Sequence, residues 1–407
     1  MLIRKAYKFR LNTNTETEQL MSQYAGNCRF LWNKALVMNL FKLENKQRLF
    51  YYDEFDWFSK LWKKSEEYSF LKLSPAQTLQ QTLLQLERAF KDAFDKKQPL
   101  KCIPVFKKRH QSNSFTLPQG FKLGNKCIFL PKIGWVNYRK SRNIIGKVKN
   151  VTVSKSGKYW FASLQVEREI ITPMHRSKSI VGGDLGVKRL LTLSDGTYFE
   201  PIETSKQADK IKWLQRKRAK KVKFSGNWQK SKQKITELHT KIANIRRNKL
   251  HKLSTTLSKS HAIIVLEDLQ IKNMTKSAKG DAEQHGSMVR QKSGLNRVIL
   301  SQGWGMLKEF LQYKQTWRGG EVVFVDPKGT SQTCPVCQHK SKENRLTQSH
   351  FECVECGYVN NADHVGALNI LARGHRVIAC GVIGVARHGE AGTSAVSDNR
   401  TPNLVLN

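Results

Sequence analysis

The chain has 407 residues, enough for two or three domains that each bury an apolar core. Hydrophobic residues make up 39% and charged residues 25%, values typical of folded globular proteins, so wholesale disorder is excluded. Lys and Arg number 71 against 32 Asp and Glu, and a net charge of +39 favours a polyanionic partner that screens the self-repulsion. Nucleic acid is the leading partner, ahead of a ribosomal-type accessory role or a membrane surface, because no basic amphipathic helix dominates the sequence.

The first part of the chain combines a strand with a helical block. Residues 1–11 alternate basic and apolar side chains, which predicts a β-strand and not a signal peptide. Residues 15–96 then show helical spacing. Ser74, Pro75 and Gln77 predict a helix start with an N-cap, a first-turn proline and a capping box. The apolar stripe that follows predicts the core of a bundle and consists of Leu79, Leu83, Leu86, Phe90 and Phe94.

Residues 101–169 change to a hydrophobic period of two, which predicts a small antiparallel β-unit. The first strand has no other sheet to join, so we expect it to pair with this unit. Residues 1–14 and 97–172 would then form one split β-barrel. The helical block would be an insertion into that barrel.

Residues 173–385 contain three strands, a long helical pair at 206–259, a strand, a helix at 295–316 and a final strand. Hairpin strands followed by alternating helices and strands are typical of a ribonuclease-H-like α/β domain, a mixed sheet covered by helices. Residues 272–294 are rich in Lys, Ser and Gly and predict a mobile loop, while residues 386–407 predict a disordered tail. The whole chain is therefore expected to be a multidomain α+β protein.

Three acids stand at the ends of predicted elements of this domain. Asp184 ends its first strand, Glu267 ends its fourth strand, and Asp363 begins the helix after the fifth. In the expected fold they converge at one sheet edge, where carboxylates can hold two Mg²⁺ ions for phosphodiester hydrolysis. Each acid alone is more often a solvated strand end or a helix cap. The glycines of Gly182–Gly186 favour the metal site, because they let a phosphate backbone come close to Asp184.

Four cysteines follow the pattern Cys-x2-Cys-x15-Cys-x2-Cys, in which each pair can form a tight turn that points two thiolates at one ion. This spacing predicts one structural Zn²⁺ ion, because four thiolates leave no coordination position open for water. The site would be an insertion at residues 329–360. The expected ligands are Cys334, Cys337, Cys353 and Cys356.

Residues 206–259 contain 18 Lys or Arg but only two acids, Asp209 and Glu237. Apolar residues recur there at helical spacing, which predicts packed helices that line a channel for phosphates. A merely solvated basic face is the alternative. The candidate nucleic-acid contacts of this segment are Lys212, Arg216, Arg218, Arg246 and Arg247.

Short family-specific motifs occur along most of the chain, up to about residue 385. They are Gly26, Arg29, Phe30 and Asn33, then Gly182–Val187, Val265–Leu269 with Asn273–Met274, Leu295–Arg297, Gly329–Cys334, and Cys356–Gly357 with Asn361–Asp363. Together these motifs resemble the TnpB family, transposon-encoded RNA-guided DNA endonucleases related to the type V CRISPR effectors.

The resemblance implies that Asp184, Glu267 and Asp363 form a RuvC-type metal site beside the cysteine site. A guide RNA from the transposon end would supply the sequence information, gripped by a wedge-like barrel and a helical recognition subdomain. The protein itself would check only a short motif beside the target double-stranded DNA, with Gln80 as a candidate contact. A prokaryotic, cytoplasmic protein is implied, associated with the nucleoid when bound to DNA. No membrane or protein partner is indicated.

Three residues depart from the usual pattern of the family. Gln338 stands where a glycine commonly follows the second cysteine, and Asn361 and Val365 replace residues that are often Asp and Asn around the last acid. All three acids are retained, so the expected activity is metal-dependent cleavage of DNA. A transposase that joins strands at a similar site and a regulator that only occupies DNA are the alternatives.

Overall fold

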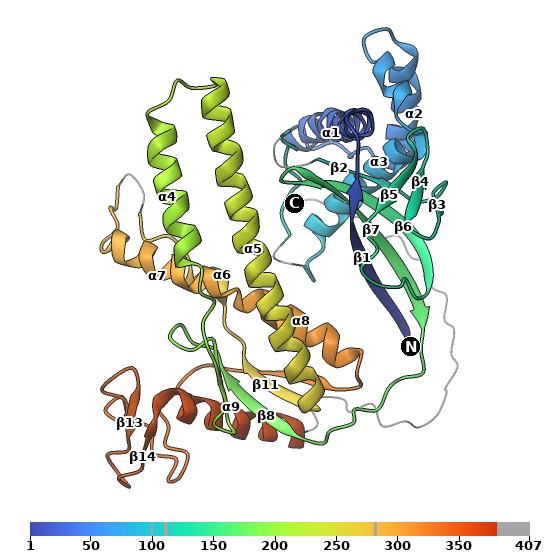
Figure 1. The fold of residues 1–407 in the computed structure, drawn as a ribbon. Helices are drawn as coiled ribbons and strands as arrows, with labels where there is room; N and C mark the ends of the chain where they lie inside the picture. Colours follow the sequence, from blue (N-terminus) through green and yellow to red (C-terminus); the bar gives the residue numbers. More distant parts are fainter. Residues whose placement is uncertain (99–100, 110–112, 281–282, 381–407) are drawn as a thin grey trace. The chain divides into compact units, whose positions relative to one another are not determined.

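The computed structural model describes residues 1–98, 101–109, 113–280 and 283–380. They form a mixed α/β structure of two compact units, one of residues 1–173 and 203–247 and the other of residues 174–202 and those from 248 on (Figure 1). In the described part of the chain, none of the helices has the length and apolar character that a membrane span requires.

The first unit contains a seven-stranded antiparallel sheet (Figure 1). Inside this sheet, β1 (Leu2–Asn12) lies between β7 (Tyr159–Glu169) and β5 (Gly134–Tyr138). Phe9 and Leu11 are buried, because alternate side chains of a strand point to the same face. The predicted pairing of the first strand with the later β-unit is confirmed. The strand order is β2-β6-β7-β1-β5-β4-β3, with β2 (Ser114–Leu117), β3 (Lys122–Leu123), β4 (Cys127–Leu130) and β6 (Lys147–Ser156).

The predicted helical block is also present in this unit. The apolar stripe of its last helix is buried up to Phe90, whereas Phe94 at the end is 54% exposed. The predicted capping by Ser74 is wrong: Pro75 is the N-cap, because the buried Ser74 hydroxyl instead accepts a hydrogen bond from Asn27 Nδ2 at 2.8 Å. The elements are α1 (Thr15–Glu44), α2 (Tyr52–Lys64), the 3₁₀ helix η1 (Ser69–Leu73) and α3 (Ala76–Phe94).

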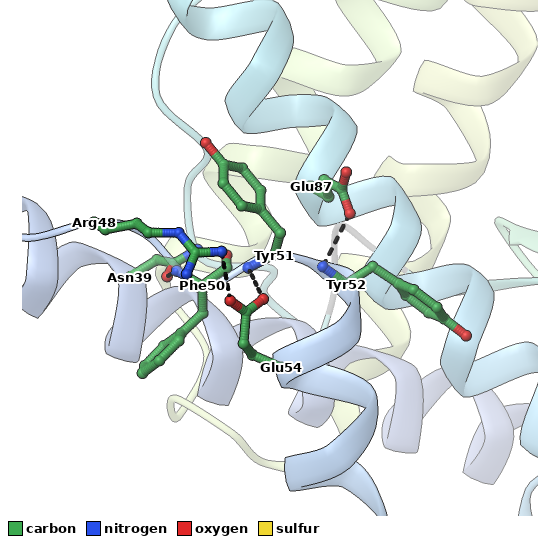
Figure 2. Close-up of polar contacts among 7 residues, drawn as sticks. All are labelled: Asn39, Arg48, Phe50, Tyr51, Tyr52, Glu54 and Glu87. Carbon is green, nitrogen blue, oxygen red and sulfur yellow. Dashed lines mark hydrogen bonds and ion pairs between the residues drawn. The ribbon is translucent and has the colours of Figure 1, made fainter. Parts of the chain in front are cut away.

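The loop from α1 to α2 is held by side chains of the neighbouring helices (Figure 2). The buried amide of Asn39 on α1 donates to the carbonyl oxygen of Phe50 and accepts its backbone N–H, both at 2.9 Å. Glu87 on α3 accepts the backbone N–H of Tyr52 at 2.9 Å. Because these bonds satisfy backbone groups that would otherwise need water, they fix the start of α2 against α1 and α3.

The predicted long helical pair is present as α4 (Ser205–Ala219) and α5 (Gly226–Ser260) (Figure 1). Ile211, Leu214 and Ile235 form a small apolar core between the two helices. The predicted helical spacing of the apolar residues is thereby confirmed. Most of the Lys and Arg side chains of the pair lie at the surface.

The second unit contains a five-stranded mixed sheet in the order β10-β9-β8-β11-β12. Figure 1 labels β8 and β11 of this sheet. Within it, β8 (Ile180–Asp184) pairs in parallel with β11 (Ile263–Glu267), which pairs in parallel with β12 (Glu321–Val325). The antiparallel hairpin of β9 (Leu191–Leu193) and β10 (Tyr198–Phe199) extends the sheet. The middle of β11 is fully buried, as expected of a central parallel strand.

The helices of the second unit differ from the prediction in two places. The single helix predicted at 295–316 is wrong, because the chain breaks at Gly303, whose φ of 73° suits a residue without a Cβ. Parts of the predicted loop at 272–294 are helical, and the predicted tail lies outside the described residues. The elements are α6 (Ile271–Met274), α7 (Val289–Gln302), α8 (Trp304–Thr316), β13 (His350–Glu352), β14 (Val359–Asn361) and α9 (Ala362–Ala379).

Candidate active site

Two of the three predicted acids lie at the same edge of the five-stranded sheet. Asp184 is the last residue of β8 and Glu267 is the last residue of β11. The parallel register pairs Gly183 with Leu266, so the two following carboxylates leave the sheet together. This edge is formed by the carboxyl ends of parallel strands, where open α/β sheets place their ligands.

Asp363 joins this edge from α9, where it is the second residue. This helix packs on β8 so closely that position 182 has no room for a side chain: a Cβ on Gly182 would lie 2.4 Å from the carbonyl oxygen of Ala367. A Cβ on Gly366 would lie 3.1 Å from Oδ2 of Asp184. Gly366, at the start of the second turn of α9, therefore lies against the Asp184 carboxylate.

Asp184 is influenced electrostatically by the other two acids. Burial, followed by the charges of Glu267 and Asp363, raises the pKa of Asp184 to about 7, while Arg345 acts in the opposite direction. Burial also raises the pKa of Glu267, against the opposing hydrogen bond from Thr330. Asp184 and Glu267 are thus both perturbed by burial, and carboxylates with raised pKa values gather at functional sites.

Three further side chains support these acids, and sequence reasoning missed them. Thr330 donates its hydroxyl hydrogen to Oε1 of Glu267 across 2.5 Å. Asn369 on α9 is buried and donates to the carbonyl oxygen of Thr330 at 2.8 Å. Arg345 Nη2 lies 3.5 Å from Oδ1 of Asp363. Of these three residues, only Thr330 could have been found from the sequence, because it lies shortly before the first cysteine. Arg345 and Asn369 lie in segments without a recognisable pattern.

Asn361 and Val365, the two residues near Asp363 that depart from the usual pattern of the family, are compatible with the position of Asp363. The side-chain oxygen of Asn361 accepts the backbone N–H groups of Asp363 and His364 at 3.1 and 3.4 Å, which caps α9. Asn and Asp are equally good N-caps, so this replacement keeps the cap. Val365 is fully buried in an apolar cluster that includes two of the cysteines.

The four predicted cysteines come together in the second unit. All four Sγ atoms lie within 4.8 Å of one another, with 3.6 Å between Cys334 and Cys356 and 3.5 Å between Cys337 and Cys353. Four thiolates bonded at about 2.3 Å to one tetrahedral ion would be about 3.8 Å apart, so the donor set fits a single metal ion. Among the described residues, these four cysteines are the group of His, Cys, Asp or Glu side chains placed to hold one metal ion.

Each cysteine pair closes a turn that ends in a left-handed residue. Gln338 follows Cys337 with φ 63°, and Gly357 follows Cys356 with φ 69°. Each donates its backbone N–H to the carbonyl oxygen of the first cysteine of its pair, at 3.1 and 2.9 Å. Glycine adopts positive φ without a Cβ clash, whereas glutamine does not. The departure at position 338 therefore introduces local backbone strain.

The predicted nucleic-acid contacts lie on three different helices of the first unit. On α3, Gln80 donates to Asp56 at 3.2 Å, and on α4, Lys212 pairs with Asp209 at 2.9 Å. The Arg218 guanidinium lies 5.3 Å from the centre of the Trp228 ring. Their contacts to nucleic acid stay a prediction, as do those of the three remaining candidates, the exposed Arg216 and Arg247 and the half-buried Arg246.

Three family profiles match the chain. The profile "Helix-turn-helix domain" matches residues 1–47, "Probable transposase" matches residues 163–278, and "Cas12f1-like, TNB domain" matches residues 304–370. Residues 1–47 contain β1 and the single long helix α1, so the first profile's name does not describe their fold here. The third profile covers the four cysteines and Asp363.

Two relatives are similar over nearly their whole length. The chain is 52% identical over 380 residues to the Escherichia coli K12 protein named RNA-guided DNA endonuclease InsQ, which covers 93% of this chain and 94% of the relative. It is 31% identical over 388 residues to a Streptomyces pristinaespiralis protein also named RNA-guided DNA endonuclease, covering 93% and 91%.

A solved structure shares the fold. The Cas12f1 chain in a complex with single guide RNA and target DNA aligns with a TM-score of 0.54 and 12% identity, over 91% of this chain and 98% of that chain. The first two profiles are those of the OrfB proteins of IS605 elements. Together with the 52% identity to InsQ over nearly the whole length of both chains, these profiles show that the chain belongs to the TnpB family.

Proposed function

We propose that the protein is an RNA-guided DNA endonuclease of a transposable element, which hydrolyses phosphodiester bonds of target DNA at Asp184, Glu267 and Asp363. The observation that carries the proposal is geometric: Asp184 and Glu267 end neighbouring parallel strands, and the helix that carries Asp363 packs against Asp184. The two full-length relatives are named RNA-guided DNA endonucleases, which supports the same activity here.

The acids fit a pair of Mg²⁺ ions, since hard cations prefer carboxylate oxygens. When bound, two such ions supply an activated water and neutralise the charge that builds up on the phosphate. The protein side chains position the carboxylates that would hold these ions. Thr330 fixes Oε1 of Glu267, and Gly366 leaves space beside Asp184. Because the pKa of Asp184 is about 7, cation binding there is coupled to loss of its proton.

We assign the four-cysteine cluster to one structural Zn²⁺ ion, because thiolates favour zinc and four of them fill a tetrahedral site. The segment between the two cysteine pairs carries Arg345, whose guanidinium lies beside Asp363. The ion would therefore act on the cluster of acids indirectly, by holding this segment in place. The zinc ribbon is proposed at residues 329–360 within a RuvC-like domain at 173–385.

We assign residues 1–14 and 97–172 to a wedge-like split barrel and residues 15–96 to a recognition subdomain inserted into it. The antiparallel sheet of the first unit, with its helices between β1 and β2, supports this layout. A guide RNA and a double-stranded DNA target with a short adjacent motif are the proposed partners, and Gln80 is the candidate motif contact. The net charge of +39 suits a protein that grips nucleic-acid backbones.

The experiment compares Asp184→Ala with Asp268→Ala in protein purified with its RNA. Asp268 is a matched control, because it follows Glu267 but has a side chain that is 59% exposed and pairs with Lys308. Asp184→Ala should abolish Mg²⁺-dependent cutting of a matched DNA while RNA-dependent binding of that DNA persists. Asp268→Ala should cut like the wild type. Loss of both cutting and binding in Asp184→Ala would make this acid structural.

The same assay separates the alternatives. Covalently joined strands formed without RNA would identify a transposase, and guided or unguided binding without metal-dependent nicking would identify a regulator. Sequencing of the RNA that co-purifies with the protein gives an independent test. A transcript of defined length is expected, and its absence would contradict the guided mechanism.

A further inference from the structure

A groove of about 1010 Å³ opens in the first unit between the start of α5 and the hairpin of β6 and β7. Two aromatic rings line one part of it, Phe224 and Trp228, with ring centres 5.5 Å apart. Around them the lining contributes five cations, Arg109, Lys155, Lys158, Lys230 and Lys232. The groove thus combines flat apolar faces with a positive surround.

Phe224 is held in this groove by strained backbone. Its side chain is 68% exposed, and its φ of 68° is left-handed, which a bulky residue adopts only under constraint. The constraint comes from the residues that follow: Ser225 Oγ accepts the backbone N–H of Trp228 at 3.2 Å, and Gln229 Nε2 donates to the carbonyl oxygen of Phe224 at 3.0 Å. The fold therefore keeps an exposed aromatic side chain on a strained backbone, and backbone strain of this kind clusters at binding sites.

The charges of the groove favour an anionic occupant. Glu18 lies 3.6 Å from Lys155 and Glu237 lies 3.6 Å from Lys158, so two of the five cations have a carboxylate partner in the lining. The groove keeps a net positive charge. The Lys232 ammonium also lies 5.6 Å from the centre of the Trp228 ring, so phosphate and base contacts would fall within reach of each other.

We propose that this groove binds an unpaired nucleotide of the guide RNA, with its base stacked on Phe224 and its flanking phosphates held by the lysines. The inference rests on the proposed function. Aromatic faces stack on any base, and cations supply the attraction to phosphate. The volume is that of an ordinary ligand site. RNA is favoured over target DNA, because folded RNA presents splayed bases in loops and bulges, whereas the target strand is paired with the guide.

The test measures binding of a short fluorescent oligouridine over a range of salt concentrations. Phe224→Ala should weaken binding about ten-fold at every salt concentration, because stacking is lost but no phosphate contact is. Lys230→Ala should instead lower the slope of log affinity against log salt by about one. Phe224→Tyr keeps an aromatic face and should bind like the wild type. Phe41→Ala, which removes a 63% exposed phenylalanine of α1, is the matched control and should also be unchanged.

Binding by Phe224→Ala equal to that of the wild type would overturn the inference, as would an equal loss in Phe224→Tyr. If Phe224→Ala weakens oligothymidine but leaves oligouridine binding unchanged, the groove takes single-stranded DNA and the assignment to RNA is wrong. Phe224→Gly separates binding from folding, because it removes both the ring and the strain: a higher unfolding temperature with weaker oligouridine binding is expected. A lower unfolding temperature would make the ring structural.

The outcome is distinguishable from failure of the proposed function. Wild-type protein carrying its own RNA should cut a matched DNA whether or not the groove binds a nucleotide. If it cuts and Phe224→Ala binds oligouridine normally, the groove inference alone fails. If the wild type carries no RNA and does not cut, the proposed function fails.

Discussion

Glu267 accepts the hydroxyl hydrogen of Thr330 at 2.5 Å, although the two residues are 63 positions apart in the chain. The carbonyl oxygen of Thr330 in turn accepts a hydrogen bond from Asn369 of α9. One line of contacts thus runs from α9, through the loop after β12, to the end of β11. Such partners of a ligand side chain fix its orientation and strongly affect metal affinity.

Thr330→Val removes the hydroxyl group and keeps the shape of the side chain. We expect about 10- to 100-fold weaker activity or Mg²⁺ affinity, because Glu267 loses the bond that orients it. The measurement is the cleavage rate as a function of Mg²⁺ concentration. Thr330→Ser keeps the hydroxyl and should behave like the wild type, while an unchanged Mg²⁺ dependence in Thr330→Val would contradict this role.

Gly366→Ala tests the space beside Asp184. The new Cβ would lie 3.1 Å from Oδ2 of that carboxylate and displace it by a few tenths of an ångström. We expect cleavage to fall about ten-fold, since small misplacements at a reacting centre are costly, while helix stability is kept or improved. Gly294→Ala in α7 is the control, because a Cβ there meets nothing within 4 Å. Equal cleavage by both variants would argue against a close fit around Asp184.

Asp184 also determines how the stability of the metal-free protein depends on pH. Its pKa is raised from 3.8 to about 7, so between these values the folded chain binds more protons than the unfolded chain and stability falls as pH rises. In EDTA at about pH 8, Asp184→Asn should raise the free energy of unfolding by about 2–4 kcal/mol. The difference should vanish near about pH 4. Urea unfolding at both pH values measures it, and a pH-independent difference would show that burial of the charge is not the cause.

Gln338→Gly should stabilise the cysteine site. The substitution removes a Cβ from a residue with φ 63°, where the steric cost for a non-glycine residue is about 1 kcal/mol. Equilibrium unfolding should show a gain of that size. Gln338→Ala keeps the Cβ, so a similar gain in that variant would point to another cause.

Cys353→Ser should release the metal ion of the ribbon and reduce cleavage, because Arg345 loses its support beside Asp363. Native mass spectrometry measures the ion count, and a loss of one ion per chain is expected. Cys380→Ser is the control, since this exposed cysteine lies outside the cluster. Retention of the ion in Cys353→Ser would exclude a four-thiolate site.

The sequence predicted those parts of the site that depend on local chemistry. Asp184 and Glu267 could be identified because each is the acid at the end of an apolar strand. Both the strand and its end are visible in a few consecutive residues. The two Cys-x2-Cys turns likewise carry their geometry within a few residues. The succession of strands and helices along the chain followed from the change between the two hydrophobic periods, which is also local.

The missed features depend on contacts between distant segments. Ser74 matches a capping pattern, but Asn27 of another helix forms a hydrogen bond with its hydroxyl. Arg345 lies in a polar segment that looks like any surface loop, and only the folded ribbon brings it to Asp363. The break at Gly303 is an exception with a local cause: it depends on a single φ value, which the helical spacing on either side conceals.

The central place of β11 in the five-stranded sheet has a practical consequence. Its two neighbours, β8 and β12, come from segments on opposite sides of it in the chain, and the side chains in its middle are buried on both faces of the sheet. A polypeptide divided between β8 and β11 would leave neither fragment with a complete sheet or with both strand-borne acids. Such fragments would be inert apart and regain cutting only on reassembly, which suits a switch controlled by an inducible dimeriser.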